Sequence, residues 1–249
     1  TLTGKITSVN ILPREGGEGD LLFFLDSLGR PTTMNITRFI AGEYTPVTRD
    51  IIDVGKRPPL ATPSCIYGNN LTVTVNNTRN KFFRFKYRWV YDDFEKSTCS
   101  PISAMPIPDK LLDDEFTNVS TNNNQITVSI NVGPKNVAKV ELLVSYVDRT
   151  NAWSDFALVE SLDKAELSIS DNIDYAYTFY NNATYPIIDI NESILLYDYV
   201  PELANAQEMP NGNVLTYAVI TEGIDRYLDP NVVITIGTVA AGGSTGSLS

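Results

Sequence analysis

The segment FRFKYRWVY, residues 83–91, decides the fold class of this chain. Aromatic side chains occupy every odd position of the segment, and the even positions 84, 86 and 88 carry positive charge. Successive side chains of a β-strand point to opposite faces, whereas a helix would scatter this pattern around its axis. The segment is therefore predicted to be a strand with one aromatic face, which lines a hydrophobic core. That face consists of Phe83, Phe85, Tyr87, Trp89 and Tyr91.

Both faces of this strand have alternative interpretations. The basic face, with Arg84, Lys86 and Arg88, is suited to pair with acidic side chains on neighbouring strands, or to hold an acidic partner subunit. Aromatic side chains on a strand also stack on bases or sugars, which is the alternative to a core role.

The rest of the sequence shows the same strand periodicity. Leu21–Leu25 and Pro31–Ile36 flank a short turn and predict a β-hairpin, and Ser97–Ser103 reads as an extended run. Further strands are predicted at Leu71–Val75, Gln125–Val132, Ala138–Tyr146, Trp153–Leu162 and Tyr175–Tyr180. Short strands with frequent turns are typical of an all-β protein built from β-sandwiches.

Breaks in this pattern are few. Helical turns are expected only within Pro108–Phe116 and Val200–Glu208. Val47–Pro63 is rich in turn-forming residues and predicts a domain boundary.

The chain starts at Thr1 without a methionine, so we expect a processed protein or a piece of a longer one. Residues 240–249 are small and predict a flexible linker or end.

Composition narrows the classes of function. The 249 residues carry a formal net charge of −11, and an acidic chain gains nothing from counterion release on nucleic acid. The charge serves solubility, or it forms an acidic wall past which DNA slides without sticking. The sequence contains no stretch of 18 apolar residues, so no transmembrane helix is predicted.

The sequence offers little catalytic chemistry. It contains no histidine, which excludes Ser-His-Asp and Cys-His mechanisms. The two cysteines, Cys65 and Cys99, are predicted to be buried free thiols, with a disulfide between them as the alternative. No catalytic, cofactor-binding or metal-binding residue is therefore predicted, and no cofactor.

Several motifs that resemble ligand sites are interpreted as structural. The acidic groups Asp92-Asp93 and Asp113-Asp114-Glu115 lack EF-hand spacing and are expected to be solvated turns rather than Ca²⁺ ligands or a glycosidase pair. Gly16–Gly19 is not followed by the lysine of a P-loop. Glycosylation sequons are interpreted as chance in an asparagine-rich chain; they begin at Asn35, Asn70, Asn76, Asn118, Asn182 and Asn191.

Three stretches resemble known proteins. Lys81–Pro108, KFFRFKYRWVYDDFEKSTCSPISAMPIP, resembles the late strands of a fibronectin type III or related immunoglobulin-like domain, where an aromatic strand leads through an acidic turn to a Ser-Pro edge strand. The amino-acid sequence of this stretch is also similar to that of tail proteins of short-tailed, crAss-like bacteriophages. Leu196–Asp225 and, more weakly, Leu21–Ile36 resemble the same proteins. The family that these stretches resemble is the tail nozzle, called the muzzle in crAss-like phages.

The resemblance implies an organisation and a role. It implies that residues 1–57 and 198–249 belong to one propeller-like β domain, with immunoglobulin-like modules at 58–109 and 110–197 inserted in it or next to it. It implies a non-enzymatic structural protein of the virion tail that forms a ring around the DNA exit channel. The expected partners are further copies of the chain and other tail or portal-associated virion proteins, with transient passage of DNA and no membrane insertion.

Two other functions are weighed against this one. An extracellular adhesin or carbohydrate-binding immunoglobulin-like module would present Trp89 or Trp153 in an exposed groove. A glycoside hydrolase fragment would need two carboxylates facing one cleft, and the sequence shows no such pair.

Overall fold

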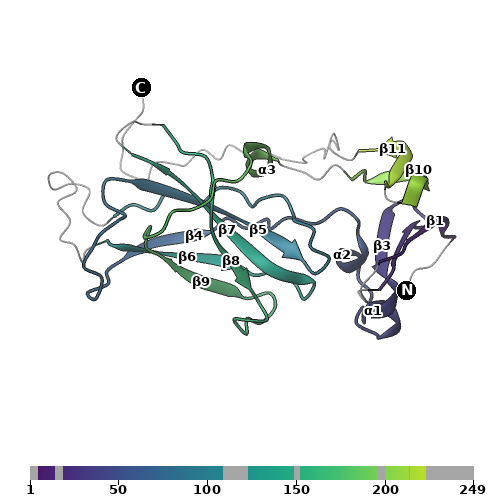
Figure 1. Ribbon diagram of the computed structural model, residues 1–249, viewed down its shortest axis with the longest axis horizontal. Helices are drawn as coiled ribbons and strands as arrows, with labels where there is room; N and C mark the ends of the chain where they lie inside the picture. Colours follow the sequence, from purple (N-terminus) through teal and green to yellow (C-terminus); the bar gives the residue numbers. More distant parts are fainter. Residues whose placement is uncertain are drawn as a thin grey trace, which may run out of the picture.

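The computed structural model describes residues 5–14, 19–108, 123–148, 152–195, 200–212 and 214–222. In these residues the chain forms short antiparallel strands in several sheets, with only a few short helical turns. The predicted all-β class is therefore confirmed. Figure 1 shows a larger unit at the left and a smaller unit at the right, joined near the end of β5.

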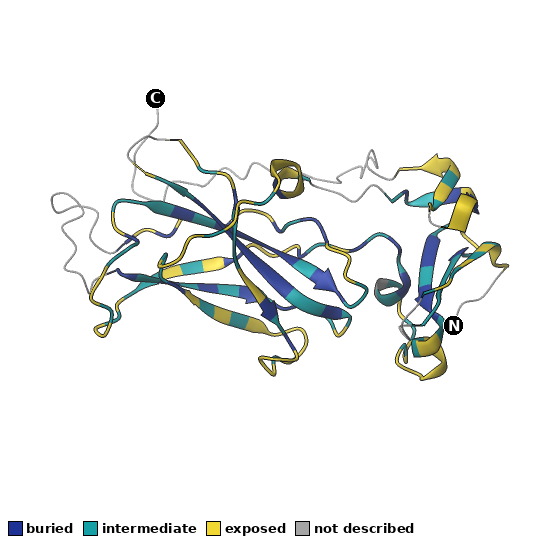
Figure 2. Ribbon diagram, in the orientation of Figure 1, coloured by how far each residue is buried: buried dark blue, intermediate teal, exposed yellow. Residues whose placement is uncertain are grey.

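The larger unit contains two three-stranded sheets that face each other. One sheet has the order β4 (Ser64–Gly68), β6 (Gln125–Asn131) and β9 (Asp174–Phe179). The other has the order β5 (Phe82–Tyr91), β7 (Val137–Val147) and β8 (Ala157–Asp163). One cluster of buried side chains draws on both sheets, so the two sheets form a β-sandwich (Figure 2).

The aromatic face of β5 lies in that core, as the alternation predicts. Phe83, Phe85 and Tyr87 are at most 1% exposed. Phe179 of β9 meets the rings of Phe83 and Phe85 edge-on, at centroid distances of 5.3 and 5.2 Å, a geometry that aromatic pairs prefer. This strand therefore binds the two sheets together through its aromatic side chains.

The segment Ser97–Ser103 covers the second edge of β5. Its three serines donate their backbone N–H groups to the carbonyl oxygens of Trp89, Tyr87 and Phe85, at 2.8–2.9 Å. Each serine hydroxyl accepts the backbone N–H of the same partner residue, at 3.0–3.1 Å. The serines recur every three residues, whereas their partners on β5 recur every two, so the two segments cannot form a regular backbone ladder. The serine hydroxyls accept the N–H groups of β5 that a backbone carbonyl would accept in such a ladder. The edge of β5 is thus satisfied without a regular strand.

The two segments expected as separate modules, 58–109 and 110–197, share this single core. The first segment contributes β4 to one sheet and β5 to the other, and each pairs with a strand of the second segment: β4 with β6 and β5 with β7. Because β4 and β5 lie in different sheets and do not pair with each other, 58–109 forms no sandwich of its own. One sandwich therefore replaces the two expected modules in the described residues.

The smaller unit contains the predicted hairpin. β2 (Leu21–Leu25) pairs antiparallel with β3 (Pro31–Asn35), which confirms that prediction, and β1 (Thr7–Leu12) adds to the other edge of β2. Two short helices follow, α1 (Ile36–Ile40) and α2 (Arg49–Ile52). The Asn35 side chain caps α1 by accepting the backbone N–H of Arg38 at 3.1 Å.

The chain returns to this unit after the sandwich. β10 (Leu203–Glu208) pairs with β11 (Thr216–Thr221), and the Ala204 N–H donates to the Gly29 carbonyl at 2.7 Å. Gly29 has a φ of +81°, and a Cβ there would lie 2.7 Å from the carbonyl oxygen of Ala204. Only glycine permits this approach. The described parts of 1–57 and 198–249 thus contact each other, and the sandwich is inserted between them.

Three local predictions are wrong. Leu71–Val75 is not a strand, because the Asn70 side chain accepts the Thr72 N–H at 3.0 Å and turns the chain instead. Val200–Glu208 contains β10 rather than a helical turn, since pairing with β11 outweighs local propensity. Helices also form where none was expected, in α1, α2 and the five-residue α3 (Ile190–Ile194). Figure 1 shows α3 over the sandwich.

Some predictions fall outside the described residues. These are the acidic group 113–115, residues 16–18 of the glycine-rich run, the sequon at Asn118, residues 109–116 of the expected helical segment, and the end of the chain from residue 223.

Candidate functional site: the joint between the two units

The two units meet at the turn that ends β5. This turn carries Asp92 and Asp93, and it faces α1 and the loop after α2. The β6–β7 turn reaches the same place, because the Asp92 N–H donates to the Asn136 carbonyl at 3.0 Å. Three segments far apart in sequence therefore converge on two adjacent carboxylates.

Each carboxylate of the turn pairs with a cation of the smaller unit or its connecting loop. The Arg38 guanidinium on α1 hydrogen-bonds Asp92 and also lies 3.3 Å from the Glu43 carboxylate. The Lys56 ammonium bonds Asp93 and lies 4.0 Å from Glu95. The sequence predicted Asp92-Asp93 as a solvated turn. The turn is present, but its side chains form half-buried ion pairs because the smaller unit packs against them.

Lys56 is held from several sides. The residue is 8% exposed, and its ammonium lies 5.2 Å from the centroid of the Tyr91 ring. The Tyr91 hydroxyl donates to the carbonyl of Arg57 at 2.8 Å, which fixes the connecting loop on the end of β5. A buried charge is tolerated only when it is paired, so Lys56 and Asp93 stabilise the joint only together.

Arg49 organises the smaller unit behind the joint. Its guanidinium pairs with Asp53 and donates to the Thr32 hydroxyl at 2.9 Å and to the Pro31 carbonyl at 3.1 Å. These bonds tie α2 to the start of β3. Burial lowers the pKa of Arg49, whereas at Arg38 burial is outweighed by Asp92 and Glu43, so the pKa of Arg38 is raised. Arginine starts so basic that both side chains stay charged at neutral pH.

A hollow of about 240 Å³ lies at the joint, lined by Arg38, Lys56, Asp92 and Asp93 among others. In this lining Arg38 pairs with Asp92, and Lys56 pairs with Asp93. These two ion pairs link the two units, and their acid and base groups are engaged with each other rather than available for proton transfer.

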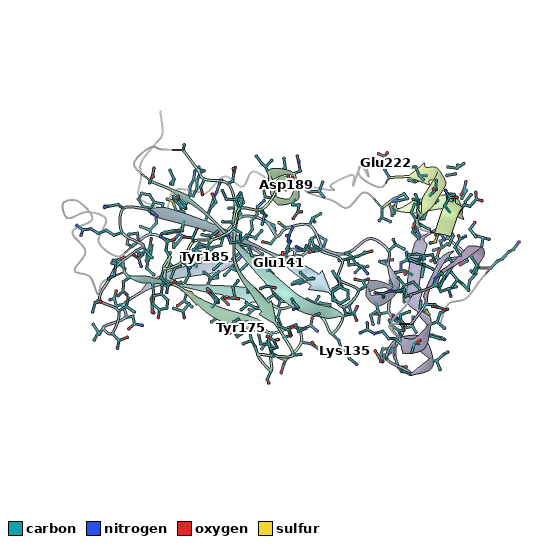
Figure 3. The ribbon with its side chains drawn as sticks, in the orientation of Figure 1. Lys135, Glu141, Tyr175, Tyr185, Asp189 and Glu222 are labelled. Atoms are coloured by element: carbon teal, nitrogen blue, oxygen red, sulfur yellow. The ribbon has the colours of Figure 1, made fainter. Side chains whose placement is uncertain are left out.

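The basic face of β5 is covered from within the chain. Arg88 lies opposite Glu141 of β7 in the sheet register, and its guanidinium binds that carboxylate at 2.6 Å, which confirms the predicted cross-strand pair. The Arg88 guanidinium also binds Glu192 of α3 at 2.7 Å, and Lys86 donates to the Ser193 carbonyl at 2.6 Å. Figure 3 labels Glu141 within the sandwich and Asp189, the N-cap of α3, above it. The acidic cover of this face is the chain's own α3.

The two tryptophans do not form a groove. Trp89 packs against the core, and its indole N–H donates to the Asn131 carbonyl at 3.0 Å. Trp153 is 38% exposed, but the guanidinium of Arg84 lies 4.1 Å from its ring centroid. The Trp89 ring is thus packed against the core and partly buried, and the Trp153 ring is stacked on a cation of the same chain.

The cysteines are free thiols, as predicted, and each is half-buried rather than fully buried. Burial raises the pKa of Cys65 to about 11, and burial also raises the pKa of Cys99. Both thiols are therefore protonated and weakly nucleophilic at neutral pH.

The comparisons with known proteins add no assignment. No family model matches the chain, and no curated protein is similar enough to count as a relative. Among the described residues, no three histidine, cysteine or acidic side chains gather as a metal site would require. In the same part of the chain, no helix has the length and apolar character needed to cross a bilayer.

Proposed function

We propose that this chain is a non-enzymatic structural subunit of a phage tail, part of a nozzle or muzzle ring around the DNA exit channel. Its smaller β unit makes the contacts between subunits, and its sandwich is a rigid module clamped to that unit. The observation that carries this proposal is the exposed apolar surface of the smaller unit. The resemblance of three stretches to tail nozzle proteins supplies the identity of the assembly.

Apolar side chains on the smaller unit face outward along its strands. On β1, Val9 is 56% exposed and Ile11 is 54% exposed. On β11, Val219 is 74% exposed and Ile220 is 48% exposed, and Figure 2 shows this strand mostly exposed. Exposed apolar strands at sheet edges are aggregation hazards that stable proteins cover. Neighbouring subunits would provide that cover.

These surfaces favour a ring over a simple dimer. β1 and β11 belong to different sheets and present different sequences, so a contact between them joins two unlike surfaces. Contacts of that kind are heterologous and close into rings when the rotation between subunits permits. The partners are further copies of this chain and other tail or portal-associated proteins of the virion.

The net charge of −11 fits a position beside passing DNA. An acidic wall repels phosphate, so DNA would pass without binding. Imaging that showed a basic channel lining in the assembled ring would remove this part of the proposal.

We also propose that the sandwich is an immunoglobulin-like or fibronectin III-like fold with a permuted chain order. One sheet, β4-β6-β9, corresponds in order to strands A, B and E of that fold. The facing sheet has the order 97–103, β5, β7 and β8, and it corresponds to strands G, F, C and C′. In that match β5 and residues 97–103 take the places of strands F and G, but they precede β6 in sequence. The smaller unit would belong to a larger propeller-like domain.

The proposal is tested by locating the chain in intact particles and by comparing the assembly mass of two variants. Imaging of intact particles should place the chain in the tail, and light scattering of the native protein should give the mass of a closed ring. The double variant Val9→Glu with Val219→Glu should reduce that mass, because it places charge on both proposed contacts. The control is Ile66→Glu on the edge strand β4 of the sandwich, where the side chain is 68% exposed. A mass unaffected by the double variant, or lowered equally by the control, would contradict the proposal.

A further inference from the structure

A second hollow opens at the end of the sandwich away from the joint. It lies where β5 begins and β7 ends, and its volume is about 280 Å³. Its lining comes from the start of β5, the end of β7, the chain before β8 and the chain after β9. The residues used below are Lys81, Tyr146, Asp155, Asn181, Thr184 and Tyr185.

Two tyrosine rings in this wall are held by the aromatic core. The Tyr185 ring lies 5.8 Å from Phe179, and the Tyr146 ring lies 6.4 Å from Phe83, measured between centroids. Phe83 and Phe179 are themselves in edge-on contact and fully buried. The ring positions are therefore fixed before any ligand arrives, which lowers the entropic cost of binding.

The polar groups around these rings have spare hydrogen-bonding capacity. In the described part of the chain, the Asp155 carboxylate and the Thr184 hydroxyl have no protein partner. The Asn181 amide donates to the Asn77 carbonyl at 2.8 Å, which orients its own carbonyl as an acceptor. Lys81 lies over the Tyr146 ring, with its ammonium 4.5 Å from the centroid. At the hollow of the joint, by contrast, Asp92 and Asp93 are paired with Arg38 and Lys56.

We propose that this hollow binds a single ring of a neutral sugar, such as one residue of a cell-surface glycan. The apolar C–H face of a sugar packs against an aromatic ring, while its hydroxyls both donate and accept. Asp155 accepts from such hydroxyls, Lys81 donates to them, and Thr184 does both. The volume of the hollow lies near the lower end for small-molecule sites, which suits one ring.

The charge of the lining argues against other ligand classes. The single positive charge of Lys81 and the single negative charge of Asp155 offset each other, so the lining offers no net attraction to an anion such as phosphate or to a simple cation. A purely apolar ligand would make no hydrogen bond with the carboxylate or the hydroxyl, whereas a sugar would use both. This site stands apart from the proposed structural role, because it lies on the sandwich and away from the smaller unit.

The test is a two-dimensional NMR titration of the native protein with four separate probes: glucose, galactose, mannose and N-acetylglucosamine. At least one sugar should shift resonances of residues 144–146, 154–157 and 181–187, with a Kd on the order of millimolar. Asp155→Asn should weaken that binding about tenfold, as expected for the loss of a charge-assisted hydrogen bond. Glu166→Gln, at an exposed acid outside the hollow, should leave binding unchanged.

Three results would overturn the proposal. The first is the absence of shifts with all four sugars at concentrations on the order of 50 mM, far above a millimolar Kd. The second is a set of shifts that maps elsewhere on the protein. The third is undiminished binding to both Asp155→Asn and a second variant, Thr184→Val. Both altered side chains are exposed, so retained spectral dispersion would verify that the variants fold.

Discussion

The sandwich and the smaller unit are held together by different interactions. In the sandwich, strands from two sheets enclose one core of aromatic and branched side chains. In the smaller unit, Phe24 and Leu25 are the only large side chains that are fully buried among the described residues, and much of the order comes from ion pairs and hydrogen bonds around Arg49. From this difference we expect the sandwich to be stable by itself and the smaller unit to depend on its neighbours.

The largest effect should come from a cavity in the sandwich core. Phe85→Ala removes a fully buried ring that contacts Phe179, and it should lower the free energy of unfolding by about 3–5 kcal/mol. Phe24→Ala makes the matched change in the smaller unit and should leave the unfolding of the sandwich nearly unchanged. Denaturant unfolding, followed by the fluorescence of Trp89 and Trp153, measures both effects. An equal loss in both variants would show that the two units unfold as one.

The next effect concerns the covered basic face of the sandwich. Glu141→Gln leaves Arg88 with only Glu192 as a charged partner, and removal of one member of a buried pair should cost about 3 kcal/mol. Glu192→Gln removes the partner that is 52% exposed, so its cost should be about 1 kcal/mol or less. Chemical denaturation of the two variants gives the comparison. A larger loss for Glu192→Gln would mean that α3, and not the strand pair, holds this face.

A smaller effect on stability is expected at the joint. The double variant Asp92→Asn with Asp93→Asn removes the charges that Arg38 and Lys56 bind, but it touches no residue of the sandwich core. The unfolding of the sandwich should hardly change, while small-angle scattering should show a wider range of orientations between the units. Unchanged scattering would assign the rigidity of the joint to other contacts, such as the bond from Tyr91 to Arg57.

The smallest effect is the pH dependence of the thiol in β4. Because burial raises the pKa of Cys65 from 9.0 to about 11, stabilisation by this protonated thiol is full below pH 9 and is lost as the pH rises through 11. At pH 8 the native thiol should react with iodoacetamide about a hundredfold more slowly than in the unfolded chain, because the thiolate fraction follows the pKa. Mass spectrometry of the alkylated peptide measures this rate. Equal rates in both states would contradict the burial of Cys65.

The sequence predicted the features that depend on neighbouring residues. Alternation identified β5 and its core face, and the spacing of apolar runs around a short turn identified the hairpin of β2 and β3. The sequence did not reveal the contacts between segments that are distant along the chain. Arg88 and Glu192 are 104 residues apart, and Lys56 and Asp93 are 37 apart, so no local pattern shows that these charges meet. The shared core of 58–109 and 110–197 was missed for the same reason.

Hydrogen exchange, measured on the isolated chain and on the particle into which we propose that it assembles, tests the central claim most directly. In the isolated chain, amides of β5, β6, β7 and β9 should open together at one high free energy, and those of β1, β10 and β11 should open much more readily. In the particle, the strands of the smaller unit should gain protection while the sandwich stays unchanged. Separate opening of 58–109 and 110–197, or a smaller unit that is equally exposed in the particle, would contradict the account.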